Sequence, residues 1–128
     1  MITRLRTSKD AKERIEALNR VLHLSSNAVL LRLAISKSII SPKAIDDDAD
    51  AVVKDFGGFE ITRVTLFGGN ESVYKYAMGI KKVDSDEKFF PTLTLKHIER
   101  GLKILEREYK LAGNKDRFYL NLVNKLDK

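Results

Sequence analysis

Hydrophobic and polar positions in the first forty residues follow two periods in turn. Arg4 and Arg6 alternate with less polar residues over positions 2–7, which predicts a short strand with one basic side. Apolar residues then recur every three or four positions up to residue 22, which predicts an amphipathic helix. Residues 27–38 are apolar on most sides and predict a second helix that several neighbours must bury.

Serines mark the beginning of both predicted helices. Ser8 precedes the first helix, and Ser25 or Ser26 precedes the second; serine side chains accept hydrogen bonds from the free N–H groups of a first helical turn. Strand, helix, turn and helix in this order are typical of a ribbon-helix-helix unit, which we expect at residues 2–40. Its strand pairs with that of a second copy, and the resulting ribbon lies in a groove of DNA. The apolar second helix also favours a partner chain.

The second half of the chain is expected to add a strand and three helices. Residues 59–67 are rich in β-branched and aromatic side chains and predict the strand. Apolar spacing predicts helices over residues 71–81, over residues 92–111 with Leu95, Ile98, Leu102, Leu105 and Tyr109 buried, and around Phe118, Leu122, Val123 and Leu126.

Gly101 lies inside the longest of these helices. Glycine costs about 1 kcal/mol relative to alanine in a helix interior, so we expect another element to pack closely there. The predicted fold class is mainly α with short β-strands (α+β). We expect a single domain over residues 1–128, in which residues 59–126 complete the core.

The charge is positive and unevenly distributed. The chain has 24 lysines and arginines, 18 acidic residues and a net charge of +6. Residues 1–41 carry +5, residues 42–58 carry −3 and residues 59–128 carry +4. A basic chain favours phosphate backbones or acidic surfaces as partners. Cysteine is absent, and no apolar run approaches 18 residues, so the sequence predicts no disulfide, no membrane span and a cytoplasmic location.

The acidic segment at residues 46–50 matches a calcium-binding loop only in part. Asp46, Asp48 and Asp50 match its first, third and fifth positions, but Ala51 and Gly57 occupy the places of its glycine and closing glutamate. We therefore expect no metal there and a solvated acidic loop that repels DNA.

Signatures of catalysis are scarce. His97 and Glu99 do not form the HExxH pattern, and the glycine pairs lack the lysine of a phosphate-binding loop. The sequence therefore predicts no cofactor and no enzymatic activity. One alternative stays open, a metal-dependent nickase that uses Glu60, Glu71, His97 or Glu99.

Basic residues of the first forty positions form the candidate DNA-binding site. Strand arginines can bond guanine or reach phosphates, and a helix start suits a phosphate. The candidates are Arg4, Arg6, Lys9, Lys12, Asn27, Arg32 and Lys37. Arg4 and Arg6 could instead face water or pair with Asp10 and Glu13. If an oligomer covers the ribbon, the basic residues of the last two helices become the better candidates.

Several segments resemble a known family. RLRTSKDAKERIEAL, then LSSNAVLLRLAIS, then TLFGG at 65–69 and KHIERGLKIL at 96–105 are similar to the DNA sulfur modification protein DndE family. The family pattern leads us to expect a glycine between the first two helices and a proline before Asn27. This chain has Leu22-His23-Leu24 and Ser26 instead.

The resemblance implies a small component of the DNA phosphorothioation machinery. Family members are expected to be homotetramers that bind duplex DNA, prefer nicked duplex and leave the sulfur chemistry to partner proteins. A ribbon-helix-helix repressor or antitoxin is the alternative, although the patterned second half argues against a minimal repressor.

Overall fold

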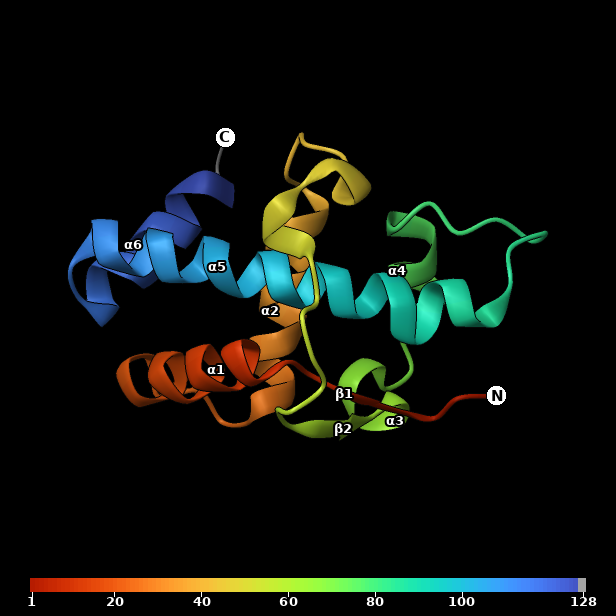
Figure 1. The fold of residues 1–128 in the computed structure, drawn as a ribbon. Helices are drawn as coiled ribbons and strands as arrows, with labels where there is room; N and C mark the ends of the chain where they lie inside the picture. Colours follow the sequence, from red (N-terminus) through yellow and green to blue (C-terminus); the bar gives the residue numbers. More distant parts are fainter. Residues whose placement is uncertain (127–128) are drawn as a thin grey trace.

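The computed structural model describes residues 1–126 and consists mainly of helices, with one two-stranded sheet at the lower side of the view in Figure 1. The sheet contains β1 (Arg4–Arg6) and β2 (Glu60–Thr62). The helices are α1 (Lys9–Leu22), α2 (Asn27–Ile39), α3 (Arg63–Phe67), α4 (Glu71–Ala77), α5 (Thr94–Ala112) and α6 (Lys115–Leu126). The predicted fold class is confirmed.

Both N-terminal helices begin at predicted serine caps. The Ser8 hydroxyl accepts a hydrogen bond from the N–H of Ala11 at 2.9 Å, and that of Ser26 accepts one from Val29 at 3.3 Å. Helix α1 is followed by its C-cap residue His23, whose φ of 55° lies in the left-handed region. Glycine adopts this conformation without strain. The glycine that the family pattern leads us to expect in this turn would therefore suit the position that His23 occupies here.

The ribbon forms within one chain, which corrects the prediction that two copies share it. Strands β1 and β2 run antiparallel, with Arg4 opposite Thr62 and Arg6 opposite Glu60. Leu5 lies between the two arginines and is buried. Because β2 takes the place of a second copy's strand, the ribbon needs no partner chain.

Helix α2 is likewise buried by its own chain, which corrects the inference that a partner must cover it. It packs chiefly against α5, and also against α3 and α1. A Cβ built at Gly101 of α5 would lie 1.8 Å from the carbonyl oxygen of Ala34 in α2. The close approach predicted at Gly101 is therefore confirmed.

The predicted strand over residues 59–67 is wrong beyond Thr62. The Thr62 hydroxyl accepts a hydrogen bond from the N–H of Thr65 at 3.2 Å and begins α3, which buries Leu66 and Phe67. Helix α4 also ends earlier than predicted, at Ala77, before Gly79 with its φ of 76°.

The bounds of the last two helices, α5 and α6, agree more closely with the predicted ones. Helix α5 begins after η3 (Lys88–Leu93), a wide helical turn that is interrupted at Phe90 and contains a cis Phe90–Pro91 peptide bond. Helix α6 buries Phe118, but Val123 is exposed, contrary to prediction. The side chain of Leu126 lies outside the described part of the structure.

Residues 43–58 cross the surface of α5 on their way to β2 (Figure 1). They include two short helical turns, η1 (Ile45–Asp47) and η2 (Ala49–Ala51). We call this segment the acidic strap, because it carries the aspartates of the negatively charged region.

Candidate nucleic-acid interface

The outer side of the ribbon exposes the two arginines predicted from the sequence. Arg4 forms an ion pair with Glu60 at 3.7 Å, between side chains that are 66% and 45% exposed. Arg6 donates from Nη1 to the carbonyl oxygen of Gly58 at 3.3 Å. The Arg4–Glu60 pair lies in solvent, where an ion pair contributes little and a phosphate can replace it.

The end of the acidic strap is fixed to the junction between β1 and α1. The N–H of Thr7 donates to the carbonyl oxygen of Phe59, and the N–H of Gly58 donates to that of Thr7, both at 2.8 Å. The Thr7 hydroxyl accepts from the N–H of Phe59 at 2.9 Å. A Cβ at Gly58 would lie 2.2 Å from the carbonyl oxygen of Ser8, so only glycine fits there.

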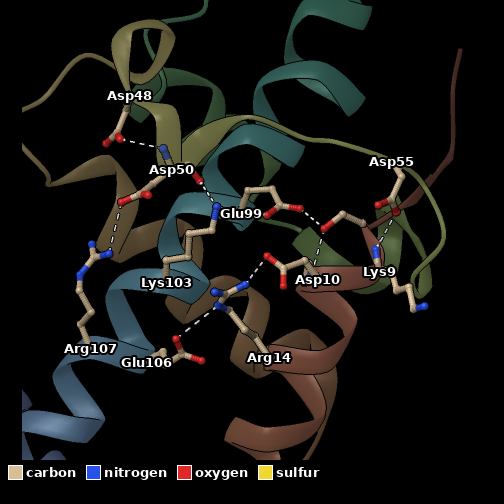
Figure 2. A network of polar contacts seen from close by, with 12 residues as sticks. Lys9, Asp10, Arg14, Asp48, Asp50, Asp55, Glu99, Lys103, Glu106 and Arg107 are labelled. Atoms are coloured by element: carbon tan, nitrogen blue, oxygen red, sulfur yellow. Dashed lines mark hydrogen bonds and ion pairs between the residues drawn. The ribbon is translucent and has the colours of Figure 1, made fainter.

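Asp55 caps the free end of α1 from the strap, a role that our sequence analysis missed. Its Oδ1 accepts from the N–H groups of Lys9 at 2.8 Å and Gly57 at 2.9 Å, and these bonds lower the pKa of Asp55 (Figure 2). An aspartate two residues before a glycine pair is the local signal of such a turn. The backbone at this helix start is therefore occupied by protein groups.

Lys9 and Lys12 extend the basic surface from the ribbon onto the first turn of α1. The Lys9 side chain is exposed, and that of Lys12 lies over the Phe59 ring with its Nζ 5.3 Å from the ring centroid. The exposed Glu13 and Glu16 follow along α1 and end the basic surface there. We call Arg4, Arg6, Lys9 and Lys12 the cationic edge.

The other three candidates from the sequence contact the protein itself. The Asn27 side chain accepts a hydrogen bond from Asn19. Arg32 donates to the carbonyl oxygens of Thr65 and Leu66 at 3.3 and 3.0 Å. Lys37 is buried and forms an ion pair with Glu108 at 2.9 Å. Because α2 lies in the core, its cations stabilise the fold and do not extend the cationic edge.

The acidic strap lies at the surface, as predicted, with the Asp46 side chain 72% exposed, but it is also paired with α5, which the sequence did not predict. Asp46 contacts Lys96 at 2.8 Å, Asp48 contacts Arg100 at 3.4 Å and Asp50 contacts Arg107 at 3.3 Å. Lys103 donates to the backbone oxygen of Asp50 at 3.0 Å. The four cations recur at helical spacing on one side of α5. The strap therefore neutralises this basic row, which is the α5 part of the alternative candidate formed by the last two helices.

Figure 2 shows a second network, which joins α5 to the start of α1. The buried Glu99 accepts a hydrogen bond from the Ser8 hydroxyl, and burial raises the pKa of Glu99. Arg14 forms ion pairs with Asp10 on α1 and with Glu106 on α5, the latter at 3.5 Å. These contacts fix the helix that carries Lys9 and Lys12.

The four residues considered for a nickase do not converge. Glu60 pairs with Arg4 on the ribbon, and Glu71 pairs with the buried Arg63. His97 bonds the Ser38 hydroxyl at 2.7 Å, and its burial lowers its pKa to about 4. Within residues 1–126, no group of three histidines or acidic residues could hold a metal ion, and no helix is long and apolar enough to cross a membrane.

The fold and this surface define a small, mainly helical protein with a two-stranded ribbon and a cationic edge. The family model of the DNA sulphur modification protein DndE matches residues 4–113, which is most of the chain. The chain therefore belongs to the DndE family, and the resemblance noted in the sequence is confirmed.

Among solved structures, the fold is similar to that of DndE from Escherichia coli B7A, a protein involved in DNA phosphorothioation modification. The two chains are 16% identical, and the match covers 80% of this chain and 96% of that chain with a TM-score of 0.61. At this identity the match supports the fold alone. A search of curated proteins finds no significant match.

Proposed function

We propose that this chain is a non-catalytic DNA-binding component of the DNA phosphorothioation machinery. In this proposal it holds duplex DNA, with a preference for nicked duplex, in the cytoplasm, and partner proteins of the machinery perform the sulfur chemistry. Membership of the DndE family supports the pathway. The observation that carries DNA binding is the cationic edge, where the ion pair between Arg4 and Glu60 is exposed and long.

The cationic edge sets the expected salt dependence. If its four cations each neutralise one phosphate, the logarithm of affinity falls with the logarithm of salt with a slope of about −3.6. Raising salt from about 50 to about 200 mM then weakens binding by about 150-fold. Contacts of this kind fix position on the backbone and carry little sequence information.

A titration of paired duplexes tests the proposal. Nicked and intact duplexes of one sequence are compared at two salt concentrations, and we expect tighter binding to the nicked one. In the variant Arg4→Ala/Arg6→Ala, the salt slope should fall to about −1.8. Lys81→Ala/Lys82→Ala removes the same charge from the exposed loop after α4 and serves as control. Equal affinity for both duplexes, or an unchanged slope in the arginine variant, contradicts the proposal.

We further propose that the protein acts as a homotetramer. An apolar groove between the end of α2 and α4 supports this, because Ile39, Ile40, Val73 and Tyr74 line it and Tyr76 lies exposed nearby. Exposed apolar patches with polar rims are typical of protein interfaces. Mass measurement should give a tetramer for the native chain and a smaller species for Ile40→Glu/Val73→Glu; a monomeric native chain contradicts the tetramer.

A further inference from the structure

Phe56 stands apart from the other phenylalanines of the chain. Its residue is 62% exposed, whereas Phe67, Phe89, Phe90 and Phe118 are buried and Phe59 is half-buried. A single exposed apolar residue is common on protein surfaces. What distinguishes Phe56 is the rigidity of its backbone and the charge around it.

The backbone on both sides of Phe56 is fixed. Asp55 before it accepts hydrogen bonds from Lys9 and Gly57, and Gly58 after it donates to the Thr7 carbonyl oxygen at 2.8 Å. A Cβ at Gly57 would lie 3.7 Å from the Cβ of Lys9, so the turn packs directly on the start of α1. The ring is therefore presented without the entropy loss of ordering a loop on binding.

Basic residues contact this turn or belong to it. Arg6 bonds the carbonyl oxygen of Gly58, Lys9 bonds Asp55 through its N–H, and Lys12 lies over Phe59. Lys54 is exposed two residues before Phe56. The one acidic group of the turn, Asp55, is engaged by two backbone N–H groups (Figure 2). An exposed aromatic ring among cations that can hold phosphates is the arrangement that binds nucleobases by stacking.

We propose that Phe56 stacks on a nucleobase at an interruption of a DNA strand, while Arg6, Lys9 and Lys54 contact the flanking phosphates. In an intact duplex each base is covered by its neighbours, so the ring has no face to contact. At a nick the base step can open, and an apolar side chain can occupy it. This inference rests on the proposed function and assigns a residue to the preference for nicked DNA.

The fluorescence of a new tryptophan tests the stacking. The chain has no tryptophan, so Phe56→Trp places a single indole at the proposed contact. We expect nicked duplex to quench this indole and intact duplex to leave it nearly unchanged. Leu111→Trp is the matched control, because residue 111 is 87% exposed and lies at the C-terminal end of α5. Neither duplex should quench an indole at this position.

Affinities of two further variants complete the test. Phe56→Ala should weaken binding to nicked duplex by about 5- to 150-fold and leave intact duplex unchanged, as expected for the loss of one base stack. Phe56→Tyr should retain the preference. If the native chain prefers nicked duplex and Phe56→Ala keeps that preference, the stacking role is overturned and the proposed function stands. If the native chain binds neither duplex, both fail.

Discussion

Gly101→Ala tests the central packing contact of the fold, between α2 and α5. Three backbone atoms of Ala34, its oxygen, carbonyl carbon and Cα, lie 1.8, 2.3 and 2.8 Å from the position of the new methyl group. Backbone atoms cannot rotate away as a side chain can. The two helices must therefore separate by about 1.6 Å to reach ordinary contact at 3.4 Å.

The expected magnitude combines two opposing effects. Alanine in place of glycine favours the helix by about 1 kcal/mol. Inserting a methyl group into a closely packed contact costs about 1–3 kcal/mol and more where the obstacle is rigid. Separation of the helices also loosens the packing of Leu30, Ile98 and Leu102, which are fully buried. Because the obstacle here is backbone, we place this cost at about 3–5 kcal/mol. After the gain of about 1 kcal/mol is subtracted, we expect a net loss of about 2–4 kcal/mol in the free energy of unfolding and a fall in Tm of about 10 °C.

Urea unfolding followed by far-ultraviolet circular dichroism measures this loss. Gly69→Ala is the matched control, because no atom lies within 4 Å of a Cβ at position 69 and its φ is not in the left-handed region. The control should differ from the native chain by less than about 0.5 kcal/mol. A Gly101→Ala protein as stable as the control would refute the close approach of α2 and α5.

Three further predictions concern single residues. His97, with its folded pKa of about 4, stays neutral, while the unfolded chain gains a proton at this residue below about pH 6.5. The contribution of His97 to the free energy of unfolding should therefore fall by up to about 3 kcal/mol as pH falls from about 6.5 to about 4. His97→Gln should remove this contribution, as measured by urea unfolding at a series of pH values. His23→Gly should raise Tm through a gain of about 0.5–1 kcal/mol, because position 23 has a φ of 55°. Asp48→Asn should lose about 1–2 kcal/mol in urea unfolding, since it weakens the pairing of the buried Arg100, whereas Asp47→Asn, whose side chain has no ion pair within residues 1–126, should lose almost none.

Local chemistry was readable from the sequence because it depends on neighbouring residues. Ser8 and Ser26 accept hydrogen bonds from N–H groups three residues later, and the stripe of α1 that includes Ile15 repeats at helical spacing. Gly101 was predictable from the rarity of glycine within helices. The left-handed φ of His23 was not predicted, although the family pattern led us to expect a glycine in this turn.

The errors concern contacts between distant segments. Residues 2–7 present the same alternation whether the strand pairs with a second copy or with residues 60–62, and only the folded chain decides between them. The apolar surface of α2 likewise indicates burial without naming the neighbour, which is α5. The pairing of Lys37 was missed for the same reason, since its partner Glu108 is 71 positions away.

The acidic strap determines where a polyanion can bind. The sequence places a negative segment between two positive ones, and charge alone would allow DNA on either. In the structure the strap contacts Lys96, Arg100 and Arg107, so that its carboxylates neutralise one side of α5. The same strap then ends on the start of α1, where the carbonyl oxygen of Gly58 accepts a hydrogen bond from Arg6 and the carboxylate of Asp55 accepts one from the N–H of Lys9. One segment therefore removes a competing basic surface and positions the cationic edge, which is why we place the proposed DNA contact at that edge.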